Sequence, residues 1–258
     1  MNNKQAGFGL CLALLTGVVQ AEVQPEAQTV RFYGYAYDRD SGEYLYTEVH
    51  AERVDGDRWF GGAVRYYAPD GRLIGDKTLD FSRDPYIPLY RLDLLQQHYS
   101  EAITAIGKDT LTMEKTSGGQ SRSKTIERQA GMAADAGFHN LILAHFAELM
   151  AGRRLKFTLA VAGELDSYHF RIEKTGEKTG DTRFDGRAAV ELRVEPDSLL
   201  RLLVDPLRLS YDVGNHHLLE YVGVSNIHDP ATGSAYNVRI IYPSQAPPDA
   251  PKTLPPLD

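Results

Sequence analysis

Apolar and polar positions alternate with a period of two along most of the chain. In residues 155–161, for example, leucine, phenylalanine, leucine and valine occupy every second position. Residues 168–173 and 188–195 repeat the pattern, with charged side chains on the opposite face. A period of two is the signature of a β-strand, and strands with one polar face are typical of antiparallel sheets. The pattern therefore predicts a β-rich protein.

The N-terminal part predicts an antiparallel meander. Turn sequences rich in Asp and Gly separate four predicted strands, at residues 30–37, 44–54, 58–67 and 73–81. In the first strand, tyrosines alternate with the small residues Gly34 and Ala36, which allow another element to approach closely. The pair Gly61-Gly62 indicates a bulge or bend. We expect a short helix at residues 89–97 and about ten strands in all.

One segment, residues 135–154, has the period of a helix instead. Asp135 is a candidate N-cap, and Gly152 suits the end of the helix. The apolar face of this helix is made of Phe138, Leu141, Ile142, His145, Phe146 and Leu149. The predicted fold class is mainly β with one long α-helix, a curved antiparallel sheet or incomplete β-barrel closed by the helix. The helix either fills the hollow of the sheet permanently or acts as a movable lid.

The two ends of the chain differ from its middle. Residues 1–21 have the positive start, short apolar run and small-residue end of a secretory signal peptide. Residues 22–242 read as a single β-rich domain, and residues 243–258 as a proline-rich flexible tail. The sole cysteine, Cys11, lies in the signal segment, so the exported chain has no disulfide. Export without disulfides favours a bacterial periplasm.

Charge and hydropathy exclude two classes of partner. The chain has 28 basic and 35 acidic residues, a net charge of −7, whereas nucleic-acid binding needs a basic surface. After the signal segment no apolar stretch reaches the roughly 20 residues that cross a bilayer as a helix. We therefore expect no nucleic acid and no transmembrane segment after signal cleavage.

Candidate chemistry is sparse. His139 and His145 are separated by about 600° of helix turn, so they lie on different faces and cannot share a metal. Ser225, in the run G-V-S-N-I, lacks the second glycine of a nucleophile elbow. We expect no catalytic residue, no metal site, no cofactor and no enzymatic activity.

The tyrosines are the remaining chemical signal. The chain has 15 of them, and Tyr33 and Tyr35 share one face of a predicted strand. Sheets lined by tyrosine can bind sugars or amphiphiles. Alternatively, tyrosine is frequent here because it favours strands.

The last third of the chain carries a family resemblance. It rests on L-R-L-S-Y-D at residues 207–212, H-H-L-L-E-Y-V-G-V-S-N-I-H-D at 216–229 and Y-N-V-R-I-I-Y at 236–242. These segments resemble uncharacterised exported proteins of Gram-negative bacteria, which are similar in layout to the lipoprotein-carrier fold of the Lol chaperones. That resemblance implies an incomplete barrel with helices at its mouth and an apolar concave face that holds acyl chains.

Three functions follow as hypotheses. The first is an exported periplasmic protein that binds a lipid or another amphiphile between sheet and helix. Its predicted ligand-binding residues are Phe138, Leu141, Ile142, His145, Phe146, Leu149, Tyr33 and Tyr35. The second is a structural or interaction protein of the cell envelope with a plugged barrel and a protein partner. The third is a hydrolase.

Overall fold

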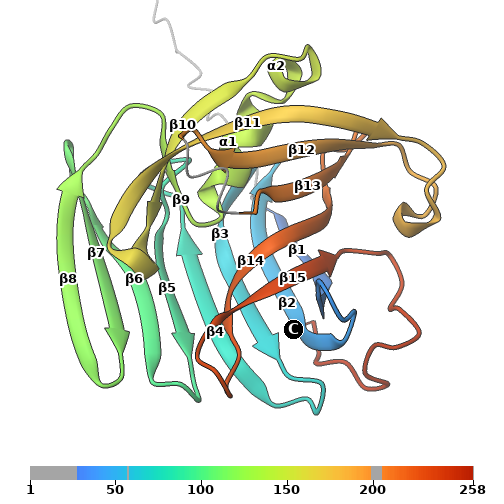
Figure 1. Cartoon of the computed structure of the whole chain (residues 1–258), viewed down its shortest axis with the longest axis horizontal. Helices are drawn as coiled ribbons and strands as arrows, with labels where there is room; N and C mark the ends of the chain where they lie inside the picture. Colours follow the sequence, from blue (N-terminus) through green and yellow to red (C-terminus); the bar gives the residue numbers. More distant parts are fainter. Residues whose placement is uncertain (1–27, 57, 199–204, 258) are drawn as a thin grey trace, which may run out of the picture.

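A computed structural model of the chain describes residues 28–56, 58–198 and 205–257. The predicted signal segment, residues 1–21, lies outside the described residues. Within the described residues, fifteen strands form one curved sheet, accompanied by two short helices and two 3-10 turns (Figure 1). No helix in this part of the chain is long and apolar enough to cross a membrane.

The first eight strands include the predicted meander. They are β1 (Gln28–Asp38), β2 (Tyr44–Asp55), β3 (Arg58–Tyr67), β4 (Leu73–Asp80), β5 (Leu89–Leu94), β6 (Tyr99–Ile106), β7 (Thr110–Ser117) and β8 (Gln120–Glu127). The remaining strands are β9 (Met132–Ala134), β10 (Leu155–Val161), β11 (Asp166–Lys178), β12 (Ala189–Pro196), β13 (Leu207–Asp212), β14 (Leu218–His228) and β15 (Ala235–Ile241). The 3-10 turns are η1 (Ala162–Glu164) and η2 (Thr182–Phe184).

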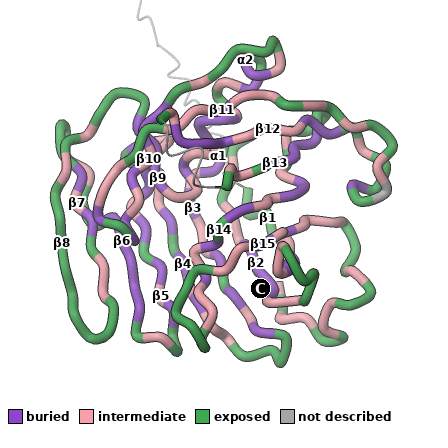
Figure 2. Tube along the Cα trace, viewed as in Figure 1, coloured by how far each residue is buried: buried purple, intermediate pink, exposed green. Residues whose placement is uncertain are grey.

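The sheet runs from β8 back to β1, continues through β15 to β10, and ends at β9. Neighbouring strands are antiparallel except β9 and β10, which are parallel. Because β8 and β9 are both edges, the sheet curls without closing, and β8 is exposed along almost its whole length (Figure 2). The prediction of a mainly β, incomplete barrel is confirmed. The expected count of ten strands was too low, and residues 89–97 hold β5 rather than a helix.

The predicted bend at the paired glycines is also confirmed. The register between β2 and β3 shifts beside Gly61, where Phe60 is the extra residue. Gly61 and Gly62 have φ of 145° and 146°, and a Cβ on Gly62 would lie 2.1 Å from the carbonyl oxygen of Ala51. Glycine is therefore required for this close approach of two strands.

The predicted helix is shorter than expected and is broken. It consists of α1 (Gly137–Ala144) and α2 (Phe146–Met150), separated at His145, whose φ and ψ are −111° and 15°. Its C-terminal end is as predicted: Gly152 has φ of 78°, and its N–H bonds the carbonyl of Leu149.

The predicted N-cap was wrong. The N-cap position is Ala136, which has no side-chain cap, and Asp135 has a left-handed φ of 45°. The Asp135 carboxylate accepts a hydrogen bond from the Ala136 N–H but otherwise points to distant partners, Lys77 and Asn226. A buried cation attracts the carboxylate more strongly than the free amides of a helix end, so tertiary contacts override the local signal.

Side chains connect the β8 end of the sheet to the turn between β10 and β11. The turn η1 packs against β6 and β7, and Lys115 Nζ donates to the carbonyl of Gly163 at 2.5 Å. Lys124 on β8 pairs with Asp166 at 3.2 Å. In Figure 1 the strands β11, β12 and β13 run across the top of the view, and β3 to β8 descend steeply from them. Buried side chains from both runs form the interior described next.

Candidate functional site

The apolar face of the helix packs against β10 to β13. Of the predicted ligand-binding residues, Leu141, Ile142, Phe146 and Leu149 are buried, and Phe138 and His145 are half-buried. Their neighbours in one apolar cluster are Phe157, Ile172, Val190, Leu192, Val194, Leu209 and Tyr211. The structure thus packs five of the six helix residues, Phe138, Leu141, Ile142, Phe146 and Leu149, into one apolar cluster.

The two tyrosines of the same prediction lie elsewhere. A side chain at Gly34 would point into the interior, toward Glu48 and Tyr242. Because successive residues of a strand point to opposite faces, Tyr33 and Tyr35 on either side of Gly34 lie on the outer face of β1. Tyr33 donates its hydroxyl to the carbonyl of Pro255 at 2.6 Å. The structure does not bring these tyrosines to the helix.

A buried polar cluster, which the sequence did not predict, lies on the inner face of the meander. Residues His50, Lys77 and Glu101 come from β2, β4 and β6. Pairing through the intervening strands aligns these three in one row across the sheet. Each is less than 10% exposed, which is rare for ionisable side chains unless they are paired.

The centre of this cluster is the ion pair between Lys77 and Asp135. Lys77 Nζ lies 2.8 Å from Asp135 Oδ2, and the two side chains are 8% and 3% exposed. Asn226 of β14 donates to the same carboxylate oxygen at 2.8 Å. Since Asp135 lies two residues before Gly137, the first residue of α1, these bonds attach the start of the helix to β4 and β14.

A second attachment comes from the helix itself. Asn140 on α1 accepts from the Trp59 N–H at 3.1 Å and donates to the carbonyls of Trp59 and Pro85, at 2.8 and 2.9 Å. Its amide group therefore continues the backbone bonding of β3 on one side and a connecting loop on the other. Together with Asp135, it fixes the helix to the first half of the sheet.

A carboxyl group with two tyrosines lies beside the ion pair. Glu101 accepts from Tyr99 at 2.6 Å and from Tyr90 at 3.0 Å. Burial raises the pKa of Glu101 above its usual range, although the hydrogen bond from Tyr99 opposes this shift. The pKa of Tyr90 is also well above normal, through burial and the Glu101 charge.

His50 lies between two carboxylates on its own strand. Its ring nitrogens are 2.9 Å from Glu48 Oε2 and 3.0 Å from Glu52 Oε1. Burial alone would lower the pKa of His50, but the bonds to both carboxylates raise it to about 9. The ring stacks on Phe32 at 4.4 Å, and Tyr242 donates to Glu48 at 3.0 Å. His50 is therefore an imidazolium at neutral pH.

These groups satisfy one another rather than pointing into open space. Within the described ranges no set of three or more His, Cys, Asp or Glu side chains is placed to hold a metal. Ser225, which the sequence raised as a nucleophile, bonds the Tyr46 hydroxyl at 2.7 Å rather than a histidine. The arrangement can hold strands and helix together by charge. Its acidic and basic side chains are already paired with each other, as Asp135 is with Lys77 and the glutamates Glu48 and Glu52 are with His50.

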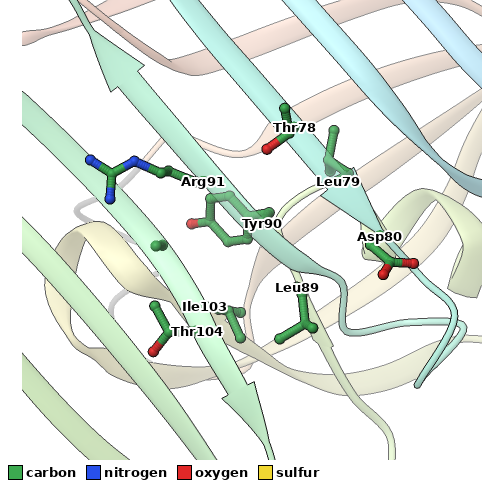
Figure 3. A pocket seen from close by; sticks show the side chains of 9 residues that line it. Thr78, Leu79, Asp80, Leu89, Tyr90, Arg91, Ile103 and Thr104 are labelled. Atoms are coloured by element: carbon green, nitrogen blue, oxygen red, sulfur yellow. The ribbon is translucent and has the colours of Figure 1, made fainter.

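Two open pockets lie on the outer face, over β4 to β7. Their volumes are about 380 and 820 Å³, and Thr78 and Arg91 line both. Figure 3 shows the smaller pocket with Arg91, Tyr90 and Thr104 around it. Arg91 forms a two-pronged pair with the neighbouring Asp93. Neither pocket is lined by a residue of α1 or α2.

The spacing of Glu48, His50 and Glu52 was the signal that could have predicted part of the cluster. Three ionisable residues at alternate positions of a strand share one face, so they are either all solvated or all buried together. The sequence does not say which face of β2 is inside. Lys77, Glu101 and Asp135 are far apart in the chain, and no local pattern connects them.

Comparisons with known proteins give no family but do give a likeness to solved structures. No protein-family model matches the chain, and no curated protein matches it. A crystal structure from Brucella abortus, described as a β-barrel-like protein of domain of unknown function DUF1849, is similar with a TM-score of 0.45 and 8% identity. The similarity covers 84% of this chain and 98% of that one. The name of that protein assigns it no function.

Proposed function

We propose that this protein is a non-enzymatic interaction or structural protein of the cell envelope, with a barrel that α1 and α2 fill permanently. The observation that carries the proposal is the buried ion pair of Lys77 with Asp135, which Asn226 completes. In such a protein the interior supplies rigidity, and binding takes place on the outer surface. Export to the periplasm through residues 1–21 is part of the proposal and rests on the sequence.

The energetics of opening support a plug rather than a lid. Moving the helix out would separate Lys77 from Asp135 and leave the buried Lys77 without this partner, at a cost of roughly 3–5 kcal/mol. It would also break the three hydrogen bonds of Asn140 and expose Ile142 and Leu149, each 0% exposed. Lids that admit ligands are drawn from weakly held segments, and this helix is strongly held.

An amphiphile carrier, the first hypothesis from the sequence, has less support. In that function Phe138, Leu141, Ile142, His145, Phe146 and Leu149 would contact the ligand. Four of them are instead covered by side chains of β10 to β13. The pockets of about 380 and 820 Å³ lie on the other side of the sheet, and no residue of α1 or α2 lines either of them.

Hydrogen exchange tests whether the helix opens. For a permanent plug, the amides of residues 141–149 exchange only with global unfolding, at the same free energy as the central strands. Native mass spectrometry of protein purified from the periplasm should show the bare chain mass. A fluorescent fatty acid should not bind.

A matched pair of variants makes the test sharper. Asn140→Ala removes the second attachment and should make residues 141–149 exchange faster than the strands, without creating affinity for the fatty acid. Arg91→Ala, which alters the outer pockets, should leave helix exchange unchanged. Exchange of the wild-type helix well below the global free energy, or a lipid that copurifies with the protein, would show that the helix is a lid.

A further inference from the structure

The outer face of β1 and the start of β2 present a group of tyrosines. Tyr33, Tyr35, Tyr37 and Tyr44, here called the tyrosine platform, form two neighbouring ring pairs. The rings of Tyr37 and Tyr44 meet edge to face at 5.3 Å, and those of Tyr33 and Tyr35 are 6.1 Å apart. Tyr44 also bonds Thr47 at 2.6 Å. The platform therefore forms an aromatic surface on the side of the sheet opposite the buried polar cluster.

The C-terminal segment, residues 243–257, lies against this platform. Tyr33 donates to the carbonyl of Pro255 at 2.6 Å, and Tyr37 donates to the carboxylate of Asp249 at 3.0 Å. Tyr35 is only 2% exposed, and its burial is the main cause that raises its pKa to about 12. Burial and then the Asp249 carboxylate raise the pKa of Tyr37 as well. The segment thus contacts both ends of the platform.

The attachment is shallow. No residue of 243–257 is fully buried; all are half-buried or exposed. The segment's bonds to the platform include one hydroxyl bond to a backbone carbonyl and one to a carboxylate, and Ser244 bonds Asp185 through its hydroxyl at 3.0 Å. By contrast, six residues of α1 and α2 are buried. The segment can therefore leave the platform without unfolding the sheet.

The chemistry of this contact is that of proline-rich recognition. Six of the residues from 243 to 257 are proline, and such segments favour an extended polyproline conformation. Proline has no N–H but keeps its carbonyl, so hydroxyl donors on flat aromatic rings are suitable partners for it. Aromatic surfaces that bind extended proline-rich segments are a recurrent mode of protein recognition.

We propose that the tyrosine platform is a binding site for a proline-rich, acid-containing segment of a partner protein, and that the chain's own C-terminal segment occupies it as an internal competitor. The inference deepens the proposed function, because it names the surface and the class of partner. The partner segment would have the pattern of residues 247–256, with a carboxylate for Tyr37 and a carbonyl for Tyr33. A segment tethered in cis acts at millimolar effective concentration, so a partner must compete with it.

The test uses the full chain with a reporter on the tail. Lys252 is exposed, and Lys252→Cys on a Cys11→Ser background provides a single thiol for an environment-sensitive fluorophore. The probe is a synthetic peptide with the sequence of residues 243–258. The peptide should displace the labelled tail saturably, with half-displacement at about millimolar concentration. A peptide with alanine in place of every proline should not.

Two conservative variants remove the hydroxyls but keep the rings. With Tyr33→Phe and Tyr37→Phe together, the ratio of bound to free tail should fall on the order of tenfold, and the fluorescence should shift toward the free-tail signal. Tyr168→Phe, at an exposed tyrosine on β11, should change nothing. If the peptide fails to displace the wild-type tail at about 10 mM, and the double variant has the wild-type signal, the platform is not such a site. Helix exchange is measured separately, so this failure would leave the plug proposal standing.

Discussion

The two parts of the interior are built on one sheet but filled differently. Under β10 to β13 the hollow is apolar, and Leu141, Ile142 and Leu149 fill it. Across β2, β4 and β6 the hollow contains charges, with Lys77, Glu101 and His50 among tyrosines. Both regions follow the same alternation of inward and outward side chains. The comparison shows that one strand pattern can enclose either a hydrophobic core or a network of ion pairs.

The two fillings respond differently to change. An apolar core depends on volume, so a smaller side chain costs stability in proportion to the cavity it leaves. A buried charge depends on its partner, so removing one member costs more than removing both. The following four variants and conditions compare the regions, from the largest expected effect to the smallest.

Lys77→Met should have the largest effect. It leaves the Asp135 carboxylate buried without its cation and should lower the free energy of unfolding by roughly 3–5 kcal/mol in urea denaturation. Adding Asp135→Asn should recover part of the loss, so that the double variant is more stable than Lys77→Met alone. Lys124→Met is the control, since Lys124 and Asp166 are 48% and 50% exposed, and it should cost at most about 1 kcal/mol. Strict additivity of the two core substitutions would contradict the coupling.

Leu149→Ala tests the apolar region. Leu149 is 0% exposed, and the variant should lose roughly 2–5 kcal/mol of unfolding free energy. Leu95→Ala, at a leucine that is 50% exposed, should change stability by no more than about 0.5 kcal/mol. A loss for Leu149→Ala as small as that of the control would mean that the helix face is not part of the core.

Alkaline pH should weaken the polar region through His50. Its folded pKa of about 9 is above the ordinary value of 6.5, so the native state holds the proton more tightly. The resulting stabilisation is complete below pH 6.5 and is lost as the pH rises through 9, a change on the order of 3 kcal/mol. Denaturation at a series of pH values measures it, and His50→Gln should remove the slope. A wild-type stability that rises over this range would refute the charged state of His50.

Gly34→Ala should have the smallest of the four effects. A Cβ at Gly34 would lie 2.7 Å from both Glu48 Oε2 and Tyr242 Cε1, so the methyl group forces the cluster apart. We expect a loss of roughly 1–3 kcal/mol in thermal or urea denaturation. Gly176→Ala on β11, where the nearest atom is a flexible carboxylate oxygen of Glu191 at 3.2 Å, should cost less than about 1 kcal/mol. Equal losses of stability in the two variants would show that the close contact at Gly34 does not require glycine more than the position of Gly176 does.

Local pattern predicted much of the fold. Alternation gave strands at residues 30–37 and 44–54 that match β1 and β2, and the helical period identified the region of α1 and α2. The local pattern gave wrong predictions where contacts between residues far apart in the chain determine the structure. Asp135 looked like an N-cap, but its partners Lys77 and Asn226 are 58 and 91 residues away. Residues 89–97 looked helical, yet pairing with β4 and β6 makes residues 89–94 the strand β5.

The sequence by itself determined that this chain forms antiparallel strands with one helical region, because hydrophobic periodicity is a local property. It also determined that Gly34 leaves room for a neighbour. Only the tertiary structure showed that this neighbour is the Glu48 carboxylate, which bonds His50. It also decided which faces of the strands lie inside. Only the tertiary structure brings Lys77 to Asp135, and this ion pair attaches the start of the helix to β4. Charge pairing across a rolled sheet depends on register and curvature, which no short stretch of sequence contains.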